Sequence, residues 1–277
     1  MKRLLLILMG AYMLGSMSMV CWAKESIPVN VREHTQKATS FLRQLPRAQR
    51  EAALAEMRGL LFMEDGNSAY SSRTGSETVE VRQGRKVIGK TKVPVRYVQQ
   101  GAKFIGTDGK LYDYYAAQRS DGGRKREAWK QAKLHIYRAG TDAAFIAFAE
   151  ELKALEVQRG IYFLKQMRPE LRAALFAEVL GLLYLDNGGD AYTGQTCYST
   201  IGGERVPYQG YREGAKFVDA QGKAHSIAQV RAEENERGKA WRTWWPGVKL
   251  NMHRAGQDAI LAPFKAEIKA MKEHAAK

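Results

Sequence analysis

The chain has 277 residues, with 44 Lys and Arg against 29 Asp and Glu, and therefore a formal net charge of +15. Hydrophobic residues make up 45% of the chain and aromatic residues 10%, and only seven residues are proline. This composition is sufficient for a buried core, and it excludes disordered and collagen-like chains.

The N-terminal 23 residues have the features of a secretory signal peptide. Lys2 and Arg3 precede an apolar stretch at 4–20, and the small residue Ala23 follows. We expect export, cleavage after Ala23, and a mature chain in the periplasm or outside the cell. An uncleaved anchor is the alternative, whereas lipidation of Cys21 is disfavoured by the branched residue before it. After cleavage no long apolar run remains, so we expect no transmembrane segment.

The strongest pattern in the sequence is an internal repeat. Three collinear blocks recur, and in the first block 13 of 30 positions are identical. Following the signal peptide at 1–23, this pattern predicts a tandem duplication with copy one at 33–155 and copy two at 156–277. The aligned blocks are 41–70 with 163–192, 93–110 with 206–223, and 129–140 with 245–256.

Each copy is predicted to begin with an amphipathic helix. Leu171, Leu175 and Val179 recur at helical spacing in copy two. Pro46 and Pro169 lie near the two predicted helix starts, where a missing amide hydrogen is tolerated. We expect these helices to end at the turn sequences of residues 64–67 and 186–189.

Strand patterns follow the first helix of copy one. Val93, Val95 and Tyr97 alternate with Pro94 and a basic residue, and the proline favours an edge strand. Residues 103–112 predict a short hairpin around a turn at 107–110.

Each copy is predicted to close with a second helix. Asp142 and Asp258 are placed to cap these helices. The predicted fold class is therefore α+β, a tandem duplication of a helix, short antiparallel sheet and helix unit. The apolar residues that share one spacing are Phe145, Phe148, Leu152 and Leu155 in copy one, and Leu261, Phe264, Ile268 and Met271 in copy two.

Positive charge is concentrated in copy one. Residues 32–155 contain 23 basic and 14 acidic side chains, whereas residues 156–277 contain 18 and 14. Nine extra residues lie between Tyr70 and Val93 in copy one, and this segment is basic. The clustered residues are Arg82, Arg85, Lys86, Lys90, Lys92, Arg96 and Lys103, followed by Arg124, Lys125 and Arg126 and by Lys130 and Lys133.

Such a cluster attracts acidic partners and speeds their association. The plainer alternative is a solvated hairpin whose charge protects a strand edge from aggregation, although one or two charges would suffice for that. Nucleic acid is the usual partner of a basic cytosolic chain, and export disfavours it. We therefore expect an acidic protein partner, with anionic envelope glycans or lipid headgroups as the alternative.

Copy two contains a tryptophan-rich segment. Trp245 aligns with Trp129 and is expected in the core. Trp241 and Trp244 have no aromatic counterpart in copy one, so the shared scaffold does not require them. Such residues could stack on sugars or anchor a protein interface, and core filling is the alternative.

Catalytic patterns are weak in this sequence. Cys197 with His225 or His253 could make a thiol nucleophile and base, although its sequence neighbours favour a bystander thiol. Glu56 and Glu178 recur between the copies and could supply paired carboxylates, although an ion pair or hydrogen bond within each copy is the favoured interpretation. We expect no catalytic residues, no cofactor and no metal site.

These patterns lead to a hypothesis about function. We expect an exported, non-enzymatic binding protein whose basic first copy docks an acidic protein, as an inhibitor or immunity-type protein would. One alternative is an envelope module for anionic glycan or lipid headgroups. The other alternative is a thiol or carboxylate hydrolase of envelope polymers.

Overall fold

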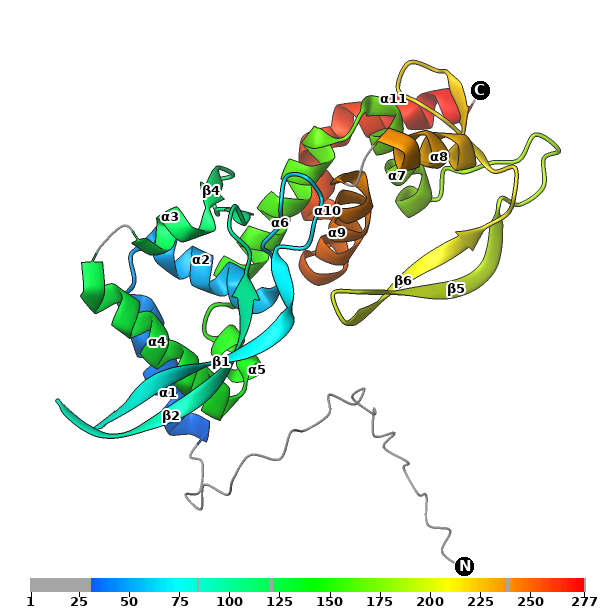
Figure 1. The fold of residues 1–277 in the computed structure, drawn as a ribbon. Coiled ribbons are helices and arrows are strands. Elements are labelled where there is room, and N and C mark those ends of the chain that lie inside the picture. The colour runs from blue at the N-terminus through cyan, green and yellow to red at the C-terminus, as the bar shows by residue number, and fades with distance from the viewer. Residues whose placement is uncertain (1–30, 84, 120–121, 238–239, 277) are drawn as a thin grey trace, which may run out of the picture.

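A computed structural model describes residues 31–83, 85–119, 122–237 and 240–276 (Figure 1). The predicted signal peptide lies outside these residues. Within them the chain forms helices and two-stranded antiparallel sheets, which confirms the predicted α+β class. No helix in the described ranges combines the length and the apolar character needed to cross a bilayer.

The first half begins with two helices and continues with two hairpins and three more helices. Its elements are α1 (Val31–Gln44), α2 (Arg47–Arg58), β1 (Tyr70–Gln83), β2 (Lys86–Val98), β3 (Lys103–Ile105), β4 (Leu111–Asp113), α3 (Tyr114–Arg119), α4 (Gly122–Ala139) and α5 (Thr141–Ile146).

The second half repeats this order of elements. It consists of α6 (Ala149–Gln166), α7 (Pro169–Leu180), β5 (Tyr192–Ile201), β6 (Glu204–Tyr211), β7 (Lys216–Val218), β8 (Ala224–Ser226), α8 (Ile227–Arg237), α9 (Ala240–Ala255), α10 (Gln257–Leu261), a 3-10 turn (Ala262–Phe264) and α11 (Lys265–Ala275). The recurrence fits a tandem duplication, which itself stays a prediction.

Helix α6 belongs to both halves and runs between them (Figure 1). It closes the first half, as α11 closes the second, and it opens the second half, as α1 opens the first. Leu152 and Leu155 lie in the first core, whereas Phe163 and Leu164 lie in the second. The predicted boundary between residues 155 and 156 therefore falls inside a continuous helix and not in a linker.

Helices α2 and α7 end earlier than the sequence predicted. Gly59 and Gly181 have φ values of 73° and 71°, a left-handed conformation that ends a helix and favours glycine. The apolar pattern continues past them because the next residues enter a buried extended segment, where Phe62 bridges to Lys103. The turns at residues 64–67 follow that segment.

The predicted closing helix is also two helices in each half. The chain breaks at residues 147–148 between α5 and α6, and it breaks again between α10 and α11. Asp142 and Asp258 were expected at N-cap positions, but Gly140 and Gly256 hold those positions. The two aspartates lie in the first turn, where their charge still favours the helix N-terminus.

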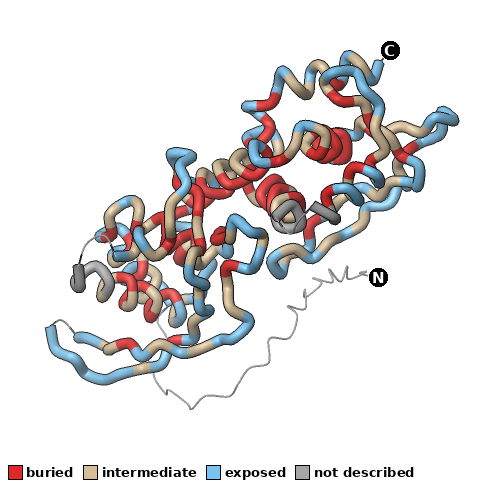
Figure 2. Tube along the Cα trace, turned by 45° about the horizontal axis from the view of Figure 1, so that its top comes forward, coloured by how far each residue is buried: buried red, intermediate tan, exposed pale blue. Residues whose placement is uncertain are grey.

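Burial follows the helices and the bases of the hairpins, whereas the far end of the β1–β2 hairpin is exposed (Figure 2). Trp129 and Trp245 are 8% and 4% exposed, so both lie in the core as predicted. Phe62 of the first half belongs to the second core, where its ring meets Phe163 edge to face at 5.0 Å. The two cores therefore touch across α6.

An ion-pair network joins the halves around Glu156 of α6, which is 3% exposed. Its carboxylate accepts a hydrogen bond from Arg58 of α2 at 2.8 Å and lies 3.6 Å from the guanidinium of Arg254 on α9. Arg254 also pairs with Glu204 of β6 at 2.6 Å and donates to the Arg58 carbonyl at 3.3 Å. One buried carboxylate thus contacts both halves.

Replacing this carboxylate should destabilise the whole chain. Glu156→Gln keeps the size of the side chain but removes negative charge beside the half-buried Arg58 and the largely buried Arg254, so we expect the free energy of unfolding to fall by about 3 kcal/mol. Urea unfolding measures this change. Glu33→Gln, in an exposed pair with Lys37 within α1, should leave the free energy of unfolding almost unchanged, because solvent screens that pair. Equal stability of the Glu156 variant and the wild type would contradict the role given to the network.

Candidate functional site: the β1–β2 hairpin

The β1–β2 hairpin extends beyond the part that packs against helix α4. Near its base Val79 and Val93 are 1% and 2% exposed, and they pack against Leu134 of α4. Every described residue from 82 to 90 is exposed, and this part projects past the helices (Figure 1). We call residues 82–90 the distal arm. A two-stranded hairpin without a covered face gains little stability from burial, so the arm is not explained by packing.

Three lysines of the predicted basic cluster form ion pairs within the first half and are not free to bind a partner. Lys130 and Lys133 of α4 lie 3.6 and 3.8 Å from the carboxylate of Glu77 on β1. Lys103 of β3 pairs with Glu64. The charges of these lysines are balanced within the first half and do not add to the surface available for a partner.

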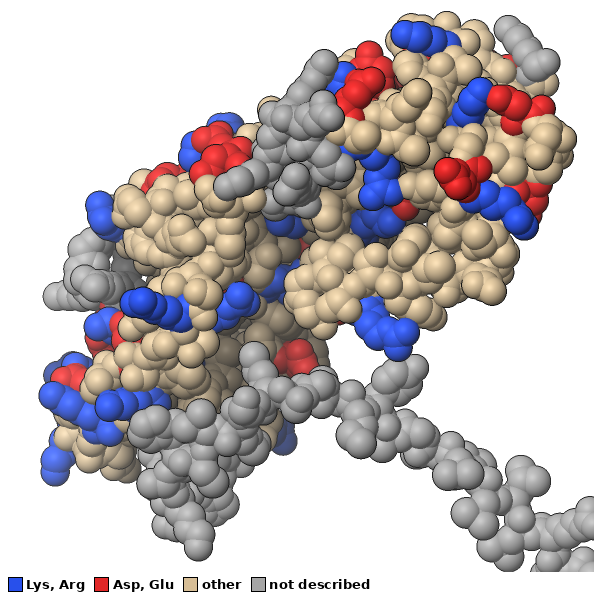
Figure 3. Space-filling view, turned by 45° about the vertical axis from the view of Figure 1, so that its right-hand side comes forward, with Lys and Arg blue, Asp and Glu red and all other residues tan. Residues whose placement is uncertain are grey.

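Strand register places the lysines of β2 on the outer face of the hairpin. Successive strand residues point to opposite faces, so Lys90 and Lys92 point away from the face that buries Val93. They lie opposite Glu80 and Thr78 of β1. Lys and Arg side chains gather at this end of the molecule in the space-filling view (Figure 3).

The remaining cations of the hairpin differ in their partners. Arg82 binds Glu80 at 2.5 Å, and the Arg96 guanidinium lies 4.8 Å from the ring centroid of Tyr70. Of the carboxylates that the structure describes, none forms an ion pair with the other four. These four cations, available for an acidic partner, are Arg85, Lys86, Lys90 and Lys92.

Two apolar residues lie among these cations. Val87 and Ile88 are 41% and 56% exposed. The register shifts between the Val81–Gly89 and Arg82–Val87 pairs, which leaves Ile88 as the extra residue of a β-bulge. Neither residue was predicted from the sequence, although an apolar pair inside an otherwise cationic segment was a usable signal.

Four predicted binding residues have side chains outside the described part of the structure. Arg124, Lys125 and Arg126 fall at the start of α4, and Trp241 falls at the start of α9. Their roles in binding stay predictions.

Trp244 packs against the second core. Its ring stacks on Phe163 with 6.2 Å between centroids and 23° between planes, and its indole nitrogen is buried without a hydrogen-bond partner. This placement favours core filling over the predicted role as a stacking platform.

The candidate thiol and histidines are not assembled into a catalytic site. Cys197 lies on β5 opposite Tyr208. His225 lies on β8, where its Nε2 is 2.7 Å from Asp219 and its ring stacks on Phe217. No hydrogen bond links the Cys197 sulfur to a histidine among the residues described.

The recurrent glutamates likewise do not face each other. Glu56 lies 3.2 Å from Lys133 and Glu178 lies 2.6 Å from Lys249, so each carboxylate pairs with the equivalent lysine of its own half. This arrangement agrees with the structural interpretation of the two residues.

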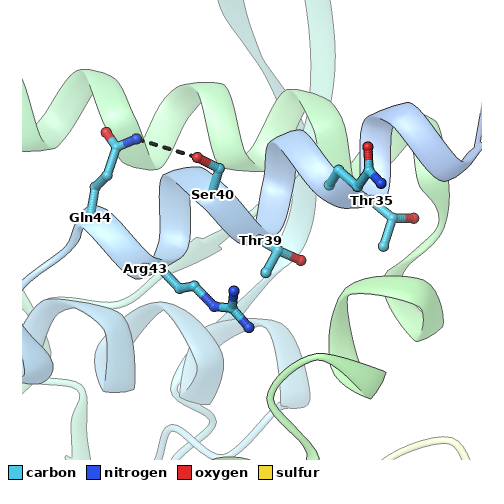
Figure 4. A pocket seen from close by; sticks show the side chains of 6 residues that line it. Thr35, Thr39, Ser40, Arg43 and Gln44 are labelled. Atoms are coloured by element: carbon cyan, nitrogen blue, oxygen red, sulfur yellow. Dashed lines mark hydrogen bonds between the residues drawn. The ribbon is translucent and has the colours of Figure 1, made fainter.

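A hollow of about 450 Å³ runs along the exposed face of α1 (Figure 4). All six of its lining side chains come from that one helix, among them Thr35, Thr39 and Arg43. One hydrogen bond, from Gln44 to the hydroxyl of Ser40 at 3.5 Å, joins two of them. A single helix face lacks the converging walls of a ligand site.

A histidine pair joins α1 to α4, the helix against which the hairpin packs. His135 of α4 is 8% exposed and follows Leu134, the residue that supports the strands. Its Nδ1 lies 2.9 Å from Nδ1 of His34 on α1, and the two rings stack. Burial, together with the neighbouring His34, Lys37 and Arg138, lowers the pKa of His135 to about 4. Burial also lowers the pKa of His34.

No protein-family model matches the chain, and no curated protein or solved structure matches it either. These comparisons therefore assign no enzymatic activity.

Acid should lower the free energy of unfolding through the histidine pair that joins α1 and α4. His135 has a pKa near 6.5 when unfolded and about 4 when folded, so below pH 6.5 the unfolded chain binds more protons and stability falls until about pH 4. The full loss is of the order of 3 kcal/mol. His135→Asn, which introduces the residue found at the equivalent position 251, should flatten this dependence in urea unfolding between pH 7 and pH 4. An equally steep decline in the variant would refute the assignment.

Proposed function

We propose that the protein is an exported, non-enzymatic binding protein whose β1–β2 hairpin docks an acidic protein partner. The observation that carries the proposal is the distal arm, which is cationic, is exposed throughout its described residues, and carries the exposed apolar residues Val87 and Ile88 near its end. Its role would resemble that of an inhibitor or immunity-type protein that inserts a projecting element into an acidic cleft.

The mixture of apolar and cationic side chains favours a protein over a glycan. Ile88 could be buried in a pocket as an anchor, while Arg85, Lys86 and Lys90 around it steer the encounter and fix the orientation. Glycan recognition would use the lysines and arginines but would leave the exposed apolar pair without a role.

The strand edges offer a second means of binding. β1 and β2 form a sheet of two strands, so each strand has one edge without a strand neighbour. An extended segment of a partner could add to either edge through backbone hydrogen bonds. Outside such a complex, lysines on the outer face would limit self-association at these edges.

The non-enzymatic part of the proposal rests on how the candidate catalytic groups are engaged. Glu56 and Glu178 are bound by lysines, and His225 is bound by Asp219. Each group therefore already has a structural contact within the fold.

Charge reversal of the arm tests the proposal. A photo-crosslinking amino acid at position 88, in cells that produce the protein naturally, should give one protein adduct with an acidic partner. Arg85→Glu, Lys86→Glu and Lys90→Glu together should reduce the yield at least ten-fold, because attraction becomes repulsion. The adduct is quantified by mass spectrometry, and the complex of the unreversed chain should weaken as salt is raised.

A matched control makes the same change of net charge elsewhere. Lys265→Glu, Lys269→Glu and Lys272→Glu lie on the exposed face of α11 and should leave the yield unchanged. Equal yields from the two triple variants would contradict the proposal, and crosslinking to lipid alone would replace the protein partner with a membrane surface.

A further inference from the structure

The second half contains a cavity that is independent of the hairpin arm. It has a volume of about 670 Å³, and residues of the β5–β6 hairpin and of helices α7, α8 and α9 line it. Such a volume is within the range of small-ligand sites. The lining residues that carry the argument are Glu178, Ser199, Tyr208, Tyr211, Arg231 and Lys249, and Trp245 also contributes.

A buried ion pair forms one wall of this cavity. The side chains of Glu178 and Lys249 are 4% and 10% exposed, and one carboxylate oxygen accepts from the Lys249 ammonium at 2.6 Å. The other oxygen, Oε2, is buried without a hydrogen-bond partner. The pair and Tyr208 also line a smaller cavity of about 230 Å³, so they are approached from two sides.

The first half closes the equivalent site with its own side chains. There the second oxygen of Glu56 accepts a hydrogen bond from the hydroxyl of Tyr114 at 2.6 Å. The aligned residue of the second half is Ile227, which has no polar atom to offer Glu178.

A second difference between the two halves changes the charge at the same site. Glu77 of the first half lies 3.8 Å from Lys133, and the strand register places Ser199 at the equivalent position opposite Val206. The second half therefore lacks both groups that complete the first site, a hydroxyl donor for the glutamate and a second carboxylate for the lysine. A buried acceptor left unpaired in only one of two equivalent places needs a specific explanation, and a bound ligand supplies one.

Arg231 gives the cavity an unbalanced positive charge. Its guanidinium donates to the hydroxyl of Tyr211 and lies 5.3 Å from the ring centroid of Trp245. No carboxylate forms an ion pair with it in the described part of the chain. A planar guanidinium held by neutral groups is suited to bind a carboxylate from outside.

We propose that this cavity binds an acidic saccharide, a sugar that carries a carboxylate. Its hydroxyl groups would donate to Glu178, and its carboxylate would bind Arg231. The hydroxyl group of Ser199 adds a further polar contact. The cavity is larger than a single carboxylate ion needs, so it has room for a sugar ring beside the carboxylate.

Calorimetric titration of the full chain tests this site. The probes are a disaccharide containing one hexuronic acid, the matched neutral disaccharide, and acetate. We expect the uronic disaccharide to bind at least ten-fold more tightly than either of the others. Arg231→Gln, which introduces the residue at the aligned position 118, should remove that preference without changing the binding of the neutral sugar. Ile227→Tyr should supply the missing hydroxyl and reduce binding of every saccharide.

The outcomes separate this proposal from the one for the hairpin. Absence of uronic disaccharide binding would overturn the site, and equal affinity for acetate would reduce it to an anion site without sugar recognition. An unchanged preference in Arg231→Gln would overturn the role of that residue even if Ile227→Tyr failed to fold. The triple reversal of Arg85, Lys86 and Lys90 should leave saccharide binding unaltered, so either proposal can fail alone.

Discussion

One helix that serves two cores constrains the rest of the structure. Residues near the N-terminus of α6 pack into the first half, and residues near its C-terminus pack into the second. Between them Glu156 is buried beside Arg58 from one half and Arg254 from the other. Removing a charge from the water is costly unless it is paired, so these three side chains must be brought together for the chain to fold. The two halves are thus held in one arrangement, with their hairpins left at the periphery (Figure 1).

A shared scaffold makes the differences between the halves informative. Both halves pair a glutamate of their second helix with the equivalent lysine, and both bury a tryptophan in the core. The first half completes its glutamate site internally and extends its hairpin into the cationic arm. The second half has a short hairpin and leaves one oxygen of Glu178 without a partner beside a cavity. Two halves with the same order of elements could in this way support two different recognition surfaces.

Periodicity and repeat alignment predicted the α+β class, the short hairpin at 103–112 and the buried Trp129 and Trp245, because these features depend on local spacing. They did not predict that one helix serves both halves, since the repeat defines copies and not the element they share. The charge of the basic cluster was overestimated for a similar reason. Glu77 lies outside the acid-free stretch in sequence, yet packing of β1 against α4 brings it next to Lys130 and Lys133. The unpaired oxygen of Glu178 was not predicted either, because it follows from a tertiary contact: Tyr114 binds Glu56 in the first half, and the aligned residue of the second half, Ile227, has no hydroxyl.

The central claim is that the arm is separable from the fold and is present for recognition. The most direct measurement is the free energy of unfolding of a chain in which residues 80–90 are replaced by Gly-Gly, which reproduces the turn at Gly202 and Gly203 between β5 and β6. This variant loses the hydrogen bond from Gln131 to the Glu80 carbonyl and the half-buried side chain of Val81, which packs against Val79, Val93 and Leu134. We therefore expect a free energy of unfolding within about 2 kcal/mol of the wild type. A loss of about 3 kcal/mol or more would place the arm in the scaffold and contradict the account.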